Sequence, residues 1–394
     1  MSAPLSVGIV CFPSLGGSGI VATELAVGLS MRGHRVHVVA SAPPSRTLPT
    51  FERLFLHEVS VPGHPALQYP PYALALASSL VEIVKDQGLD IVHTHFAVPH
   101  AASAYLARQV LGNAAPRLVT TLHGTDVTHI GSDPSYRAVT QFVVAQSDGI
   151  TVPSEYLKAE TYRRLGVPAR VPIEVIPNFV DTAHFTSAAV RDRSRFDALF
   201  DGAGGDPADR GAPVLFHVSS FRPVKQVVDL VEVLARVRRH TRARLMLVGD
   251  GPDRLRLMAR ARELDLTRSV CLVGTHPEFV DYLRHADLFV LTSESESFGV
   301  AALEAMSCGV PVLAYRVGGL PEVVTSDVGC LVTPRDPEAL ATAALRILSD
   351  DDLRERMGRA ARARAETSFR RDAAIDRYEA HYRRVLAAAP REAV

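Results

Sequence analysis

Two glutamates eight residues apart, Glu296 and Glu304, bracket a predicted strand-to-helix turn in the segment ESFGVAALE. If the helix begins near Ser297, about two helical turns separate the carboxylates, so both can face one cleft at different depths. Peptide N–H groups at a helix start bind phosphate oxygens. Here they would belong to Phe298, Gly299 and Val300. Alone, such a pair is more often two solvated residues, but Glu304 stands among apolar residues and needs a polar partner, which a nucleotide ribose would provide.

Arg222 and Lys225 place two cations on one loop, directly after the predicted strand Val214–Val218. A diphosphate leaving group carries about two negative charges, and each charge-assisted hydrogen bond to it contributes about 1.5–3 kcal/mol. An enzyme that uses no metal needs two such cations. Surface Arg and Lys mean little by themselves, so the prediction of a diphosphate site depends on the position of this loop after a strand.

A glycine-rich loop at residues 16–19, Gly-Gly-Ser-Gly, follows the first predicted strand and precedes a helix. Glycines allow a ligand to approach closely, and the N–H groups of the helix start favour an anion. The loop is not the GxGxxG fingerprint, and no acidic residue ends the second predicted strand, Arg35–Ala40, so a nicotinamide enzyme is disfavoured. A tight turn without a ligand explains the loop about equally well.

His123 follows the predicted strand Leu118–Leu122, at the carboxyl end where open α/β sheets bind ligands. Its imidazole can donate a hydrogen bond to a sugar hydroxyl or carbonyl, although a purely structural histidine is about as well supported. We interpret His93, His95 and His100 as packing and local hydrogen-bonding groups. The nearby Asp126 is the one candidate for a carboxylate nucleophile, and we expect it to hold the loop instead.

Alternating strands and helices must position these loops. Short β-branched runs alternate with helical patterns, such as Ile20–Arg32 and Tyr72–Gln87, which is typical of parallel sheets covered on both faces. In the first half the predicted strands are Leu5–Phe12, Arg35–Ala40, Asp90–His93, Leu118–Leu122, Gly149–Val152 and Glu174–Ile176. In the second half they are Val214–Val218, Arg244–Val248, Val270–Val273, Leu288–Leu291, Pro311–Ala314 and Cys330–Val332. The predicted fold class is α/β, with two doubly wound, Rossmann-like parallel sheets.

The length of 394 residues exceeds the roughly 250–300 at which a single core stops growing, so two domains are expected. We assign residues 1–177 to the first and 178–372 to the second, with a C-terminal helix of about 373–394 packing back on the first. The segment Asp201–Pro213 is rich in Gly, Pro and Asp and is predicted to be a loop. A helical pattern covers Arg354–Leu386.

Composition excludes several functions. The 43 basic and 43 acidic residues give no net charge, so neither nucleic acid nor an anionic membrane is favoured as a partner. No apolar stretch approaches the roughly 20 residues that cross a bilayer, and no basic leader begins the chain, so we expect a soluble, cytoplasmic protein without stable membrane association. The four cysteines lack CxxC or metal-ligand spacing, so neither a disulfide nor a metal site is expected.

Several motifs in combination resemble the family-4 retaining glycosyltransferases, whose GT-B architecture has two Rossmann-like domains facing across a cleft. They are SESESFGVAALEAMSCGVPV at 293–312, VGDGP at 248–252 and VGGLPEVV at 317–324, and the resemblance covers nearly the whole chain. CFPSLGGSGIVATELA near the N-terminus, YPPY at 69–72, HTHFAVPHA at 93–101, TTLHGTD at 120–126 and HVSSFRPVK at 217–225 resemble, more narrowly, the members that glycosylate L-malate in bacillithiol biosynthesis.

This resemblance implies transfer of N-acetylglucosamine from UDP-N-acetylglucosamine to the hydroxyl of L-malate, with retention at the anomeric carbon and without metal or cofactor. The N-terminal domain would bind the acceptor and the C-terminal domain the nucleotide sugar. The implied catalytic residues are Arg222 and Lys225 at the diphosphate, Glu296 at the donor sugar and His123 at the transferred sugar. The implied donor-binding residues are Gly16, Gly17, Gly251, Thr275, His276, Ser297, Phe298, Gly299, Val300 and Glu304. The implied acceptor-binding residues are Ser18, Gln68, Phe96 and Thr125.

Some positions depart from the family pattern. Ser220 stands where related enzymes commonly have arginine, and the malate-glycosylating members resemble this chain there. Those members tend to have a lysine and a tyrosine where this chain has Gln68 and Phe96, so a dicarboxylate loses a cation and a hydroxyl. The alternatives are a family-4 enzyme with an inositol-type or lipid-linked acceptor, a UDP-sugar 2-epimerase of the same fold, and a non-catalytic sugar-nucleotide-binding protein. The oligomeric state, a homo-oligomer included, stays open. For retention we prefer same-face attack, with the leaving phosphate oxygen as base.

Overall fold

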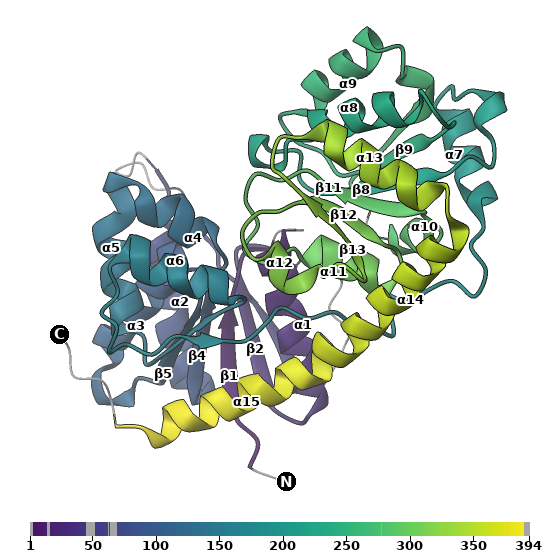
Figure 1. Ribbon diagram of the computed structural model, residues 1–394. Helices are drawn as coiled ribbons and strands as arrows, with labels where there is room; N and C mark the ends of the chain where they lie inside the picture. The colour runs from purple at the N-terminus through teal and green to yellow at the C-terminus, as the bar shows by residue number, and fades with distance from the viewer. Residues whose placement is uncertain are drawn as a thin grey trace. The chain divides into compact units, whose positions relative to one another are not determined.

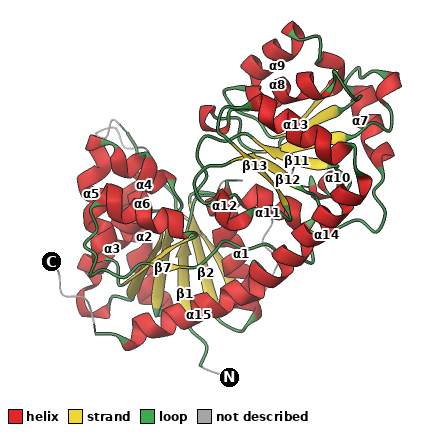
Figure 2. Ribbon diagram, in the orientation of Figure 1, coloured by secondary structure: helices red, strands yellow, loops and turns green. Residues whose placement is uncertain are grey.

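The computed structural model describes residues 3–13, 16–44, 52–61, 63, 69–276 and 278–389. It divides into two compact units (Figure 1). Unit 1 comprises Met1–Asn178 and Arg371–Val394, and unit 2 comprises Phe179–Arg370. The chain therefore passes between the units twice. Each unit contains one parallel sheet flanked by helices (Figure 2), so the predicted α/β class with two such sheets is confirmed. The assignment of acceptor and donor binding to the two domains stays a prediction.

The sheet of unit 1 has the strand order β3-β2-β1-β4-β5-β6-β7, and every pairing is parallel. Its strands are β1 Ser6–Val10, β2 Arg35–Ala40, β3 Leu54–Glu58, β4 Ile91–His95, β5 Arg117–Thr121, β6 Gly149–Val152 and β7 Glu174–Val175. The order reverses direction at β1 and β4, whose carboxyl ends lie side by side because Val10 pairs with Thr94. Such a switch point is where ligands bind in open α/β sheets.

Helices cover both faces of this sheet. They are α1 Gly17–Met31, α2 Tyr72–Gln87, α3 Ala102–Leu111, α4 Thr125–Thr128, α5 Pro134–Gln146, α6 Glu155–Leu165 and α15 Arg371–Ala387. Helix α2 buries Leu76, Leu80 and Val84, which share one helical face, in a cluster with Val92 and Leu118 of the sheet. Helix α15 returns from the end of the chain and contacts α1, β5 and β6 (Figure 1).

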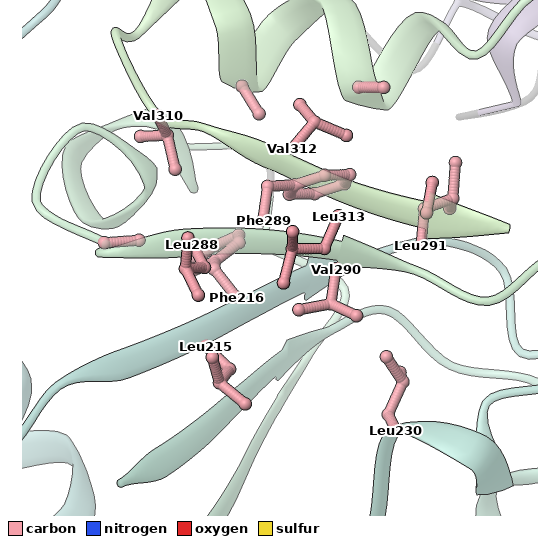
Figure 3. Close-up of a cluster of buried hydrophobic side chains, with 14 of the residues drawn as sticks. Leu215, Phe216, Leu230, Leu288, Phe289, Val290, Leu291, Val310, Val312 and Leu313 are labelled. Carbon is pink, nitrogen blue, oxygen red and sulfur yellow. The ribbon is translucent and has the colours of Figure 1, made fainter. Parts of the chain in front are cut away.

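The sheet of unit 2 has the order β10-β9-β8-β11-β12-β13 and is also parallel. Its strands are β8 Val214–Val218, β9 Arg244–Val248, β10 Val270–Gly274, β11 Leu288–Leu291, β12 Val312–Tyr315 and β13 Gly329–Val332. Its helices are α7 Asp197–Gly202, α8 Val228–Val237, α9 Arg254–Glu263, α10 Val280–Leu283, α11 Val300–Ser307, α12 Leu320–Val323, α13 Pro337–Leu348 and α14 Asp351–Ser368. Figure 3 shows the core, where Phe216, Phe289 and Leu313 of neighbouring strands and Leu230 of α8 are buried together. This packing makes the strands rigid supports for the loops that follow them.

The structure also corrects parts of the sequence analysis. All predicted strands are present, and their ends differ by two residues at most. Strand β3 was not predicted, because this edge strand leaves Phe55 and Leu56 substantially exposed. The helical pattern over 354–386 is two helices, α14 and α15. They separate at Phe369, whose C=O accepts a hydrogen bond from Val180 N–H (3.0 Å). The segment 201–213 includes the end of α7 and a 3-10 turn, Pro207–Asp209, as well as loop.

Candidate active site

Two loops of unit 2 are held together at the carboxyl ends of β8 and β9. Phe221 N–H donates to Asp250 C=O (2.8 Å), and Asp253 N–H donates to Phe221 C=O (2.9 Å). Gly249 has φ +128°, and a Cβ there would lie 1.8 Å from the Ser219 carbonyl oxygen, so only glycine fits. At Gly251 a Cβ would lie 2.7 Å from Phe221 N. The VGDGP motif thus shapes the loop that carries both predicted cations.

Both predicted cations follow β8, but they lie in different environments. Arg222 is exposed, and its Nε donates to Ser220 Oγ (3.1 Å). Lys225 ends the 3-10 turn Pro223–Lys225, and its Nζ lies 2.6 Å from Glu296 Oε1. The two paired side chains are 18% and 13% exposed. An ammonium group has three N–H donors, so Lys225 can neutralise Glu296 and still donate to a phosphate oxygen.

The Glu296 loop is fixed by glycines. Gly318 has φ +55°, and a Cβ there would lie 1.9 Å from the Glu296 carbonyl oxygen, which accepts a hydrogen bond from Gly319 N–H (2.9 Å). The VGGLPEVV motif therefore sets the backbone position of Glu296. Lys225 holds the Glu296 side chain. The loop after β8 and the loop around Gly318, which are distant in sequence, therefore orient this carboxylate together.

The expected helix start near Ser297 is wrong, because α11 begins at Val300. Gly299 precedes it with φ +99°, and Leu303 N–H donates to the Gly299 carbonyl (3.1 Å). Phe298 is buried and packs edge-on against Phe369, with ring centroids 5.5 Å apart. The N–H groups of the helix start are therefore those of residues 300–302, and Phe298 and Gly299 precede them.

Glu304 lies on the second turn of α11 and is buried, with 4% of its surface exposed. Thr275 and His276 follow β10 at the edge of the sheet. Thr275 is exposed, whereas His276 contacts Tyr282 edge-on and lines a cavity of about 260 Å³ together with Arg195, Glu278 and Asp281. Of Glu304, Thr275 and His276, His276 alone lines this cavity.

In unit 1 the glycine-rich loop turns directly into α1. The helix begins at Gly17, and Gly16 precedes it in an extended conformation. The first turn closes through Gly19 N–H to Gly16 C=O (3.0 Å). Gly16 and Gly17 are exposed, and Ser18 is half-buried. An exposed helix start rich in glycine leaves its N–H groups accessible to an anion.

His123 lies in a densely packed polar cluster at the ends of β4 and β5. Its Nε2 is 2.9 Å from His95 Nδ1, and its ring stacks on Phe96, with centroids 5.7 Å apart and an interplanar angle of 20°. Phe96 has φ +101°, a strained backbone conformation of the kind found at functional sites. Burial lowers the pKa of His123 to about 3, so its imidazole is neutral near pH 7.

Asp126 holds the loop that carries His123. Its Oδ1 accepts N–H hydrogen bonds from His123 (3.0 Å) and Gly124 (2.9 Å), and the carboxylate also accepts from the backbone N–H of Ala97. Asp126 is fully buried, and this burial raises its pKa to about 6 despite those hydrogen bonds. A carboxylate already occupied by backbone donors is a poor nucleophile, so the geometry fits the loop-holding role.

The neighbouring histidines divide into two kinds. His100 makes a local contact, as expected, with its Nδ1 2.6 Å from the His95 carbonyl. His93 instead lies between Tyr382 Oη of α15 (2.7 Å) and Thr121 Oγ1 of β5 (2.6 Å), both distant in sequence. His95 differs, because its side chain bonds to His123. Sequence analysis missed this contact, although the positions of both residues at the ends of predicted strands could have indicated it.

Of the predicted acceptor residues, Thr125 begins α4 beside His123 and is half-buried. Phe96 is 7% exposed and supports the His123 ring, and Gln68 lies outside the described residues. The structure thus brings Phe96, His123 and Thr125 together in unit 1. In unit 2 it pairs Lys225 with Glu296 and places Arg222 on the same loop as Lys225. Gly251, Ser297, Phe298 and Gly299 lie on neighbouring loops, and Val300 and Glu304 lie in α11. Across the ranges that the structure describes, no three His, Cys, Asp or Glu side chains form a cluster that could hold a metal ion.

Comparison with known proteins gives consistent matches along the chain. Residues 15–184 match the family described as Glycosyltransferase Family 4, and residues 206–364 match Glycosyl transferases group 1. The chain is 39% identical over 383 residues to N-acetyl-alpha-D-glucosaminyl L-malate synthase of Bacillus anthracis, which covers 97% of both chains. It is 32% identical over 394 residues to D-inositol 3-phosphate glycosyltransferase of Saccharomonospora viridis, which covers 92% of this chain and 89% of that protein.

Solved structures are similar in fold. Sucrose-phosphate synthase from Thermosynechococcus elongatus superposes with a TM-score of 0.80 at 23% identity, over 98% of this chain and 100% of the other. Anabaena HepE in complex with UDP and glucose gives a TM-score of 0.77 at 18% identity, over 95% and 98%. Among the described residues, no helix has both the length and the apolar character that a membrane span requires.

Proposed function

This chain belongs to the family 4 glycosyltransferases, and from that premise we propose that it transfers N-acetylglucosamine from UDP-N-acetylglucosamine to the hydroxyl of L-malate, with retention at the anomeric carbon. The observation that carries the proposal is the 39% identity, over 97% of both chains, to a protein named for the product of that reaction. The proposal places this reaction as the first step of bacillithiol biosynthesis.

The donor's diphosphate needs positive charge and N–H donors. Arg222 is exposed on its loop, Lys225 has donors left beside Glu296, and the start of α11 provides peptide N–H groups. We assign these groups to the leaving diphosphate, where they stabilise the charge that develops as the bond to the sugar breaks. Glu296 would accept hydrogen bonds from the donor sugar's hydroxyls, and Glu304 from the uridine ribose. The uracil is assigned to Thr275 and His276.

The acceptor's two carboxylates need a different environment. The glycine-rich start of α1 supports their binding, because its N–H groups are accessible to an anion. The hydroxyls of Ser18 and Thr125 would add hydrogen bonds, and Gln68 would stand where related enzymes have a cation. Phe96 would act through its support of the His123 ring.

Retention is best explained by same-face attack. The malate hydroxyl oxygen bonds to the anomeric carbon on the face from which the diphosphate leaves, and a departing phosphate oxygen accepts the hydroxyl proton. A double displacement requires a carboxylate nucleophile, and Asp126 is buried and occupied by backbone N–H donors. Neutral His123 would donate a hydrogen bond to the transferred sugar.

We also propose a cytoplasmic location. Its support is that the four cysteines, Cys11, Cys271, Cys308 and Cys330, are all unpaired, as is usual in a reducing compartment.

The experiment is an assay of UDP release by purified protein with UDP-N-acetylglucosamine and a panel of acceptors, with and without a chelator. The panel contains L-malate, other hydroxy acids and D-inositol 3-phosphate, because a D-inositol 3-phosphate glycosyltransferase is also a relative. We expect release with L-malate alone, an α-linked product by NMR, and no effect of the chelator. Release with the inositol phosphate but not with malate would replace the acceptor, and conversion of the donor to its 2-epimer without any acceptor would replace the reaction.

A further inference from the structure

His95 is the last residue of β4, and only one of its two ring nitrogens, Nδ1, has a hydrogen-bond partner among the described residues. Its Nδ1 lies 2.9 Å from His123 Nε2, and the two rings stack with centroids 5.1 Å apart. His95 is 1% exposed, and its Nε2 is buried without a hydrogen-bond partner in the part of the chain that the structure describes. Only one proton lies between the two imidazoles, so one ring donates and the other accepts.

The buried Nε2 decides which ring donates. If His123 donated, the neutral His95 ring would carry its own proton on Nε2, as a buried N–H without an acceptor, which folded proteins rarely contain. If His95 donates from Nδ1, its Nε2 is an unprotonated acceptor, which is tolerated more readily. Burial strongly lowers the pKa of His95, so a doubly protonated ring is disfavoured.

His100 shows the same arrangement next to it. Its Nδ1 must carry a proton, because the partner atom is the carbonyl oxygen of His95 (2.6 Å). The Nε2 of neutral His100 is therefore unprotonated, and it too is buried without a partner among the described residues. His93, by contrast, uses both nitrogens, on Tyr382 and Thr121, so it offers His95 no acceptor.

We propose that His95 is a positioning residue that donates its Nδ1 proton to His123 Nε2, which fixes His123 in the tautomer that presents an Nδ1–H donor to the transferred sugar. This inference rests on the proposed function for the contact between His123 and the transferred sugar, whereas the tautomer itself follows from the contacts of His95. Phe96 supports it, because its ring stacks on His123 and restricts the imidazole's rotation. Among the described residues, the His123 side chain is hydrogen-bonded through Nε2 to His95, which leaves its Nδ1 for a ligand.

The tautomer can be measured without activity. Nitrogen NMR of the full-length protein labelled with ¹⁵N-histidine distinguishes protonated from unprotonated ring nitrogens, and the spectrum of His123→Gln identifies the signals of His123 by their loss. We expect a protonated Nδ1 and an unprotonated Nε2 on His123. The opposite assignment overturns the inference. This measurement needs no turnover, so its outcome does not depend on whether the proposed donor and acceptor are correct. The UDP-release assay tests the donor and acceptor separately.

Two nearly isosteric variants test the consequence for transfer. His95→Asn places an amide near the former Nδ1 and can still donate, whereas His95→Asp can only accept at neutral pH. We expect His95→Asn to keep kcat within about threefold of the wild type and His95→Asp to lower it by about 10- to 100-fold, the effect of losing one hydrogen bond to the reacting sugar. The KM for UDP-N-acetylglucosamine should change little in either variant.

The folded state of each variant is checked by thermal unfolding. If the buried carboxylate prevents His95→Asp from folding, His95→Leu is used in its place. Leucine also lacks a hydrogen-bond donor, so the same loss of kcat is expected. Equal kcat values for the donating and non-donating variants overturn the inference, whether both are active or both impaired. A purely structural role of His95 predicts equal kcat values for the variants after correction for stability. It also predicts that the tautomer of His123 is the same in the variants as in the wild type.

Discussion

Replacing Asp126 by asparagine should remove a pH dependence of stability while lowering glycosyl transfer by no more than about tenfold. The buried carboxyl has its pKa raised from 3.8 to about 6, chiefly because burial disfavours the charged form. Protonation is thus easier in the folded than in the unfolded state, so folding takes up a proton between these values. The stability gained from this proton is complete below about pH 4 and is lost as the pH rises through 6.

The size of the effect follows from the two pKa values. Their difference corresponds to about 3 kcal/mol of unfolding free energy. Asparagine is neutral at every pH and lacks this dependence, while its side-chain oxygen can still accept the N–H groups of His123 and Gly124. The free energy of unfolding of the wild type, relative to that of Asp126→Asn, should therefore fall by about 2–3 kcal/mol from pH 4 to pH 7.

Urea unfolding of both proteins at half-unit intervals from pH 4 to pH 7 measures this difference. A difference that stays constant with pH would refute the assigned environment of the carboxyl.

Turnover at pH 7 tests the chemical role of Asp126. We expect Asp126→Asn to retain activity within about tenfold of the wild type, because loss of a true nucleophile costs about 10⁴-fold or more. Complete loss of turnover with normal folding and donor binding would favour double displacement instead.

Three further changes test other contacts. Lys225→Ala removes a cation assigned to the diphosphate, so it should lower kcat by about 100-fold or more while the circular dichroism spectrum stays unchanged. Lys225→Arg should recover part of the loss. A turnover of Lys225→Ala close to that of the wild type would exclude this role. Gly318→Ala puts a Cβ 1.9 Å from the Glu296 carbonyl oxygen and so displaces the carboxylate assigned to the donor sugar. Calorimetry should show at least about tenfold weaker binding of UDP-N-acetylglucosamine, and unchanged affinity would contradict the assigned loop function. The hydrogen bond from His381 holds the pKa of Glu174 near 2, so the stability that this pair contributes is present above about pH 4.5 and is lost towards pH 2. Acid unfolding of Glu174→Gln should lack that component, and an acid transition identical to the wild type would show that the pair contributes nothing.

Sequence patterns predicted the elements that depend on local side-chain character. Buried β-branched runs such as Val214–Val218 were located correctly, because a fully buried parallel strand has a continuous apolar signature. The edge strand β3 has half-exposed side chains and lacks it. The start of α11 was misplaced because the backbone of Gly299, at φ +99°, delays the helix, and the pattern of side chains does not report φ.

The candidate site shows the same limit. The residue types in the loops after β8 and β11 indicated a diphosphate site, but the direct pairing of Lys225 with Glu296 depends on how those loops approach one another. The contact between His95 and His123 depends on the register of two neighbouring strands, in which His95 pairs with Thr121. Such register is a property of the assembled sheet.

Helix α15 has a consequence for protein synthesis. Unit 2 is one continuous segment, whereas unit 1 needs α15, whose Tyr382 bonds to His93 and whose Glu379 bonds to His34 (2.8 Å). A chain emerging from the ribosome therefore contains every residue of unit 2 before it contains the last helix of unit 1. The domain that is translated first is therefore completed only after unit 2, and the part of its sheet that α15 contacts, at β5 and β6, stays uncovered until that helix has been made.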